Sequence, residues 1–300
     1  MRIIVLLKQI RYVYAQTGSD PKRNYVGPED IVRLTNPSDE GALEQALRIK
    51  DKYQNAEVIT ISLGDRFAEE GLRRSLAVGA NKAIHIPYEE YEELDPWATS
   101  IALAHTVKRF PYRFILCGSE ALDDNNGLVG PYVAGILQIP FLSRIVRLEL
   151  KNRDRTALVH RAVERGNREI MECSLPALFT IDRRLGTLRY PTLPGLLRAH
   201  GEAIEKLEPG DIETPTGRWG LSCNMIETIK VSRPKPKVRG QRQTDGTLSA
   251  SERLKRMMKG ADSEEGEQVT VIEGNSENAL HEVERLMRES GVEFKKGDRE

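Results

Sequence analysis

The chain has 300 residues, of which 30% are charged and 39% belong to the hydrophobic set. This length allows one large domain or two small ones with a full hydrophobic core. Lysine and arginine together number 45, and aspartate and glutamate together also number 45, so the formal net charge is zero. This balance excludes an overall positive charge that would attract nucleic acid or an acidic partner.

Cysteine usage and hydropathy indicate an intracellular protein. Cys117, Cys173 and Cys223 are far apart and form no CxxC pair, which is atypical of a secreted disulfide scaffold. Cys117 and Cys173 adjoin apolar runs, so we expect buried, inert thiols. No run approaches the 18 apolar residues of a membrane span, and the opening run 2–7 is too short for a signal peptide. We therefore expect a cytoplasmic location and no membrane span.

Strand and helix patterns alternate over residues 1–137. Apolar runs predict strands at 3–7, 57–62, 83–86 and 113–117. Helices are predicted from Asn36, from Ala68 to Gly79, from Asp95, and over 128–137. The polar segment between the first strand and Arg33 is interpreted as an irregular loop or a small hairpin. This alternation predicts an α/β fold, a mainly parallel sheet with helices on both faces.

The pattern changes after Phe141. Extended segments at 145–150, 157–163, 169–173 and 177–181 are separated by polar turns and are expected to continue the sheet, partly antiparallel. A proline-punctuated loop, 189–195, precedes a short helix predicted over 196–203.

The last part of the chain is interpreted as a C-terminal arm. We expect a domain over 1–212 and an extension over 213–300, with a linker at about 230–248. Within the arm we predict helices over 251–259 and 280–287 and a strand over 268–272. The basic run from Lys230 to Arg242 lacks interleaved aromatic residues, so a solvated linker is favoured over nucleic-acid binding. The arm is expected to cover a partner subunit, because its short helices cannot bury their apolar faces alone.

The stretch from Phe114 to Pro131 is the strongest candidate for a binding site. An apolar strand stops at Gly118, a small polar loop follows, and a helix pattern begins near Gly127. This is how α/β proteins place backbone N–H groups and a helix N-terminus around a phosphate. Any strand-to-helix turn needs a glycine and some Asn or Asp, so the loop alone leaves a plain turn open.

Other chemistry is weakly indicated. Asp123 and Asp124 suit an acid–base pair, but caps of a turn are the commoner role for such residues. The histidines lack a cysteine or second histidine at metal-ligand spacing, so we expect no metal site. We assign no catalytic residue.

Several short motifs follow one another along residues 1–212. They are the opening run 2–9, the Asn-Pro helix start 36–48, the small-residue turn 77–80, the loop 118–131, and the segments 175–177 and 189–195. In order and spacing they resemble the β subunit of electron-transfer flavoproteins, the FixA-like family. The resemblance implies the fold shared by the adenine-nucleotide α-hydrolases and these flavoproteins. It also implies an electron carrier rather than a stand-alone enzyme, with flavin-based electron bifurcation left open.

The resemblance implies an α subunit that carries the electron-transferring FAD, with an adenine nucleotide in the β subunit. That nucleotide is AMP in one branch of the family and a second FAD in another, and both remain open. Mapped by position, the site comprises Leu6, Lys8, Asn36, Pro37, Ser38, Asp39, Leu63, Gly118, Ser119, Glu120, Ala121, Leu122, Asp123, Asp124, Asn125, Asn126, Gly127, Leu128 and Val129.

The resemblance also implies a docking segment. Leu193 corresponds to the exposed apolar anchor with which the family docks on flavin-dependent, acyl-CoA type dehydrogenases, and the family also passes electrons to a quinone oxidoreductase. Arg189 and Tyr190 are assigned to the same docking role. The sequence departs from the family at Glu120, where glutamine is usual, and at 200–202, where a lysine-rich stretch is usual.

Two other functions remain open from the residues. One is an adenine-nucleotide-binding regulatory protein of similar fold. The other is a basic-tailed nucleic-acid adaptor, which would show steep salt dependence of binding.

Overall fold

The computed structural model describes residues 1–13, 31–151, 155–212, 219–227 and 229. Contacts divide the chain into the units Met1–Val231 and Ser232–Glu300, and every described residue belongs to the first unit. The linker, the two helices and the strand predicted beyond residue 230 lie outside the described residues. So does the basic run from Lys230 to Arg242.

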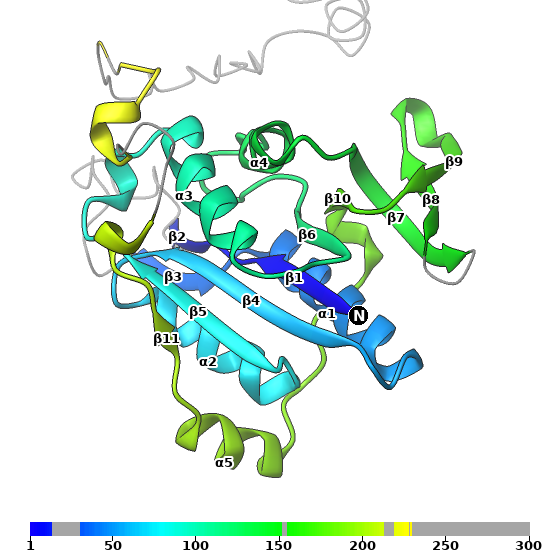
Figure 1. Ribbon diagram of the computed structural model, residues 1–300, viewed down its shortest axis with the longest axis horizontal. Helices are drawn as coiled ribbons and strands as arrows, with labels where there is room; N and C mark the ends of the chain where they lie inside the picture. Colours follow the sequence, from blue (N-terminus) through cyan, green and yellow to red (C-terminus); the bar gives the residue numbers. More distant parts are fainter. Residues whose placement is uncertain (14–30, 152–154, 213–218, 228, 230–300) are drawn as a thin grey trace, which may run out of the picture. The chain divides into compact units, whose positions relative to one another are not determined.

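A nine-stranded sheet forms the centre of the described unit (Figure 1). Its strands are β1 (Arg2–Leu6), β4 (Glu57–Gly64), β5 (Lys82–Pro87), β6 (Phe114–Gly118), β7 (Phe141–Lys151), β8 (Thr156–Ala162), β9 (Arg168–Ser174), β10 (Ala177–Ile181) and β11 (Glu205–Lys206). The spatial order is β11-β5-β4-β1-β6-β10-β7-β8-β9. All neighbours from β11 to β7 pair in parallel, whereas β7-β8 and β8-β9 pair antiparallel. The predicted mainly parallel sheet with an antiparallel extension is confirmed.

Helices cover both faces of the sheet (Figure 1). They are α1 (Pro37–Lys52), α2 (Ala68–Val78), α3 (Pro96–Lys108), α4 (Val129–Leu137) and α5 (Leu193–Gly201). Successive side chains of β1 point to opposite faces of the sheet and therefore pack in two different hydrophobic cores. Ile3 and Val5 pack with α1 and α2, and Ile4 and Leu6 pack with α3 and α4.

The polar segment after β1 includes a small hairpin, one of the two predicted forms. Strands β2 (Gln9–Val13) and β3 (Ile31–Thr35) pair antiparallel, with Gln9 opposite Thr35. The residues between these strands lie outside the described part of the chain. The hairpin is attached near the end of β4 by an ion pair between Arg33 and Asp65, and the Arg33 guanidinium stacks 3.8 Å from the centre of the Phe67 ring.

Helix α5 begins earlier than predicted. Residues 193–195, predicted to be loop, form its first turn, and the helix ends at Gly201 rather than Ala203. The Thr192 hydroxyl accepts a hydrogen bond from Gly195 N at 3.2 Å, and Pro194 lies in the first turn. These are ordinary helix-start signals. The predicted loop assignment of residues 193–195 is therefore wrong.

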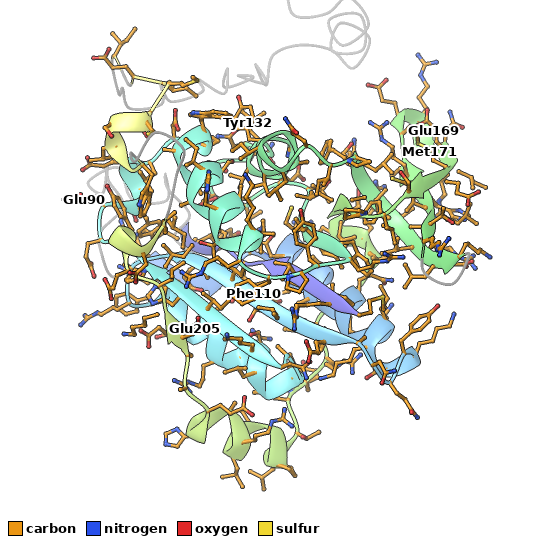
Figure 2. The ribbon with its side chains drawn as sticks, viewed as in Figure 1. Glu90, Phe110, Tyr132, Glu169, Met171 and Glu205 are labelled. Atoms are coloured by element: carbon orange, nitrogen blue, oxygen red, sulfur yellow. The ribbon has the colours of Figure 1, made fainter. Side chains whose placement is uncertain are left out.

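The two edges of the sheet differ. Figure 2 shows Glu205 on β11 at one edge, and Glu169 and Met171 on β9 at the other. Strand β11 has two residues and its side chains are exposed, so no apolar pattern reveals it in the sequence. It is fixed by backbone pairing with β5 and by ion pairs from Lys206 to Glu69 and between Lys82 and Glu205.

Candidate functional site

The candidate site lies where the connections of the sheet change direction. Strand β1 lies between β4 and β6, so the chain leaves β1 to one side first and later returns to the other. Such a reversal opens a crevice beyond the carboxyl ends of the strands. A cavity of about 400 Å³ is found there, a volume within the range of small-molecule sites.

Strand ends, the loop after β6 and the start of α3 form the walls of this cavity. The lining residues are Leu6, Leu7, Lys8, Arg11, Asn36, Asp39, Leu63, Tyr91, Glu92, Leu94, Pro96, Thr99, Leu103, Cys117, Gly118, Glu120, Ala121, Asp123, Asp124, Asn126, Gly127, Val129 and Gly130.

Asp39 ties three elements together at the cavity. Pro37 starts α1 and places the Asp39 carboxylate in the first helical turn, where it accepts hydrogen bonds from Lys8 N at 2.9 Å and Gly118 N at 2.6 Å. A Cβ at Gly118 would lie 2.6 Å from an Asp39 oxygen, so only glycine allows this approach. Burial raises the pKa of Asp39 to about 6 and outweighs the hydrogen bonds, which lower it.

Asn36 holds the loop after β6 over the cavity. Its side-chain amide donates to Glu120 O at 3.0 Å, and its side-chain carbonyl accepts from Leu122 N at 3.3 Å. Within the loop, Asp123 accepts from Asp124 N, and Asp124 accepts from Asn126 N. These contacts are those of turn caps, the commoner role predicted for the two aspartates.

Among the described residues, the cationic side chains that line the cavity are Lys8 and Arg11, and each is paired with a carboxylate. Lys8 Nζ lies 2.9 Å from Asp123 and 3.0 Å from Asp124, and Arg11 Nε lies 2.6 Å from Glu92. Burial lowers the pKa of Lys8, but hydrogen bonds and charge from the two aspartates raise it on balance. Because these cations are already neutralised, an anionic ligand depends mainly on backbone N–H groups.

The N-terminus of α4 supplies such groups. The first hydrogen bond into this helix runs from Tyr132 N to Leu128 O, so the N–H groups of Val129 and Gly130 have no partner within the helix. Gly127 precedes them with φ 64°, a conformation that favours glycine. A helix of nine residues also places partial positive charge at this end. The arrangement can therefore hold an anion.

The lining thiol is not arranged as a nucleophile. Burial raises the pKa of Cys117, with a smaller contribution from the Asp39 charge, which disfavours the thiolate. Cys173 is buried as predicted, and its pKa is likewise raised by burial. Among the described residues, no group of three or more His, Cys, Asp or Glu side chains is placed to hold a metal ion.

Most of the predicted site residues meet at this cavity. Leu6, Lys8, Asn36, Asp39, Leu63, Gly118, Glu120, Ala121, Asp123, Asp124, Asn126, Gly127 and Val129 line it, whereas Pro37, Ser38, Ser119, Leu122, Asn125 and Leu128 do not. Ser38 packs beneath Gly118, and Ser119 N donates to Ile181 O at the strand end. Leu122, Asn125 and Leu128 are exposed on the loop. Contact of any of these residues with a ligand stays a prediction.

The wall contributed by the connection after β5 and by α3 was missed from the sequence. Tyr91, Leu94, Pro96, Thr99 and Leu103 follow β5 and line the cavity. A signal was present, because every loop after a parallel strand returns at the same edge of the sheet. The Asp-Pro helix start at residues 95–96 is the first helix start after β5 and the short connection of residues 88–94, and it therefore belongs to that edge.

The predicted docking residues lie just before α5, at Arg189 and Tyr190, and at its first residue, Leu193. Tyr190 is 92% exposed and Leu193 is 68% exposed, and Leu196 and Leu197 on the same helix are exposed as well. Arg189 instead folds inward onto Glu44 of α1. The docking role of these residues stays a prediction.

Comparisons with known proteins agree on one family. A family model described as "Electron transfer flavoprotein domain" matches residues 30–212. The electron transfer flavoprotein subunit beta of Thermoanaerobacterium thermosaccharolyticum is 31% identical over 255 residues, covering 85% of this chain and 96% of that protein.

Two other relatives also match over most of this chain. The caffeyl-CoA reductase-Etf complex subunit CarD of Acetobacterium woodii is 32% identical over 250 residues, covering 83% of this chain and 94% of its own length. The Homo sapiens electron transfer flavoprotein subunit beta is 32% identical over 214 residues, covering 71% of this chain and 83% of that protein.

No helix in the described residues is both long and apolar enough to span a membrane.

Proposed function

This chain belongs to the electron transfer flavoprotein β-subunit family, and from that premise we propose that its cavity binds an adenine nucleotide. The nucleotide is AMP or a second FAD. The observation that carries the proposal is the loop of residues 118–129, which brings glycines and the N-terminus of α4 to the carboxyl ends of β1 and β6.

The residues present fit an adenine nucleotide. Leu6, Leu63 and Leu103 give the cavity an apolar wall suited to the adenine ring. The N–H groups of Val129 and Gly130 are suited to phosphate oxygens. A volume of about 400 Å³ accommodates a mononucleotide or the adenylate part of a dinucleotide.

We further propose that the chain pairs with an α subunit that carries the electron-transferring FAD. Bound FAD supplies the electron-transfer chemistry. The residues of this chain bind and orient: the loop holds the nucleotide, and α5 together with the residues just before it presents Leu193 and Tyr190 to a flavin-dependent dehydrogenase of the acyl-CoA type. Both side chains are exposed, which such a contact requires.

A pair of glycine substitutions tests the nucleotide site. At Gly127, with φ 64°, an added Cβ would lie 2.8 Å from Ser119 O, so Gly127→Ala distorts the loop. Gly166 also has a positive φ, 79°, but open space around it, and it lies outside the cavity lining. Gly166→Ala therefore matches the backbone strain without touching the pocket.

The measurement is the adenine nucleotide released when the purified heterodimer is denatured. The Gly127→Ala heterodimer is expected to keep the FAD of the α subunit and to lose the nucleotide of this chain. The Gly166→Ala heterodimer is expected to keep both. Equal nucleotide content in the two variants would contradict the proposed site.

A further inference from the structure

The segment from Arg189 to α5 exposes large apolar side chains on a fixed support. Tyr190, Leu193, Leu196 and Leu197 are all exposed within eight residues of chain. Exposed apolar side chains gathered in this way are typical of a protein contact. Rigid presentation of such a contact lowers the entropy lost on binding.

Glu44 of α1 holds the start of this segment. Its side chain is only 8% exposed and accepts three hydrogen bonds from Arg189: from the backbone N at 3.1 Å, from Nε at 3.0 Å and from Nη2 at 3.2 Å. Arg189 Nη2 also lies 2.8 Å from Asp51 near the end of α1. The two-pronged contact orients the guanidinium, and the backbone contact fixes the path of the chain.

The contact favours the charged form of Glu44. Burial alone would raise the pKa of Glu44, but hydrogen bonds from Arg189 and Arg48 lower it below its ordinary value. Because Nε and Nη2 of Arg189 contact the carboxylates of Glu44 and Asp51, these two guanidinium nitrogens already have partners within the chain. Arg189 was predicted to touch the partner, and its geometry instead suits support of its exposed neighbours.

The far end of the segment is fixed by reciprocal contacts between α2 and α5. Arg73 of α2 donates to Ala199 O and Glu202 O at the end of α5, both at 2.6 Å. Arg198 of α5 donates to Leu76 O at the end of α2 at 3.1 Å. Each helix therefore provides an arginine that caps the carbonyl end of the other.

We propose that Glu44 and Arg189 are positioning residues of the docking segment, which act by holding Tyr190 and Leu193 in the orientation that a partner dehydrogenase contacts. This inference rests on the docking role proposed above for α5. It assigns a function to Glu44, which was not among the residues predicted from the sequence. It also assigns Arg189 to the support of Tyr190 and Leu193 rather than to direct contact with the partner.

The test uses the full heterodimer with three substitutions in this chain. Glu44→Gln removes the charge and weakens the two-pronged contact. Arg189→Lys keeps the positive charge but cannot form the two-pronged contact with Glu44. Arg48→Gln is the matched control, because Arg48 also binds Glu44, at 3.0 Å, but does not touch the docking segment.

Two measurements separate positioning from folding and from the docking proposal itself. One is the steady-state reduction of each heterodimer by an acyl-CoA dehydrogenase. For Glu44→Gln and Arg189→Lys, KM for the heterodimer is expected to rise about tenfold with kcat unchanged. The other is hydrogen exchange over residues 189–201, which is expected to become faster in the same two variants and not in Arg48→Gln.

Each outcome has a defined meaning. An unchanged KM in Glu44→Gln and Arg189→Lys overturns the inference, whatever the exchange rates show. If the wild-type heterodimer accepts no electrons from the dehydrogenase, the proposed partner class is wrong. Hydrogen exchange then decides the positioning role alone, and unchanged exchange in both variants overturns it.

Discussion

Asp39 is a buried carboxylate that accepts hydrogen bonds from the backbone N–H groups of Lys8, between β1 and β2, and of Gly118, at the end of β6. Two opposing effects act on its charge. The backbone N–H groups stabilise the carboxylate, whereas burial removes its hydration, and burial wins because the pKa rises to about 6. The carboxylate that joins α1 to Lys8 and to the end of β6 therefore has a pKa of about 6, above its ordinary value.

This raised pKa predicts a pH-dependent contribution to stability. The folded chain binds the Asp39 proton more tightly than the unfolded chain, so this contribution is fully present below about pH 4 and is lost as pH rises through about 6. A rise from 3.8 to about 6 corresponds to about 3 kcal/mol. Asp39→Asn removes the titration.

The free energy of unfolding of wild type and Asp39→Asn, measured in urea at several pH values, checks this prediction. The advantage of wild type over Asp39→Asn is expected to shrink by about 2 kcal/mol between pH 4 and pH 7, the part of the full effect that falls within this range. A difference between the two proteins that stays constant across this range would show that Asp39 has an ordinary pKa.

At the scale of elements, α5 packs on α2 at very short range. An added Cβ at Gly195 would lie 2.3 Å from Ala77 O, a backbone atom that cannot move without disturbing α2. Gly195→Ala is therefore expected to lower the free energy of unfolding by about 1–3 kcal/mol. Gly201, the last residue of α5, has open space around it, so Gly201→Ala is the matched control.

Thermal and urea unfolding of these two variants provide the measurement. Gly195→Ala should unfold at a lower temperature and denaturant concentration than wild type, whereas Gly201→Ala should not be destabilised. If the two variants unfolded together, the close approach of α5 to α2 would have no energetic consequence.

The alternating strands and helices of the α/β fold could be predicted from the sequence. Apolar strands and capped helices have local signals, as at Asp95, whose side chain accepts from Ala98 N at 2.7 Å at the start of α3. The start of α5 was missed because Leu193 and Pro194 were interpreted as loop, although Thr192 before them is a capping residue. Strand β11 was missed because backbone pairing rather than an apolar pattern defines it.

The candidate site was predictable only in part, because some of its contacts join residues that are far apart in the sequence. Residues at strand ends and in the loop after β6 follow from the rule for parallel sheets. The contacts of Lys8 with Asp123 and Asp124 join residues more than a hundred positions apart, and no local pattern gives them. The wall formed by the start of α3 needed the order of the strands, which places the loop after β5 at the same edge.

At the scale of the whole molecule, the proposed nucleotide site and the proposed docking segment use different parts of the described unit. The pocket belongs to β1, β6 and the starts of α3 and α4, whereas α5 packs on α2 (Figure 1). Within the described residues, the cavity lining and the segment 189–201 share no residue. Loss of nucleotide and loss of docking should therefore be separable by substitution.

The nucleotide content of the wild-type heterodimer tests the central claim most directly. The purified complex is denatured, and the released AMP and FAD are identified and counted against protein. The account predicts about two adenine nucleotides per heterodimer: the FAD of the α subunit and either AMP or a second FAD from this chain. About one adenine nucleotide per heterodimer, all of it FAD, would contradict the assignment of this pocket.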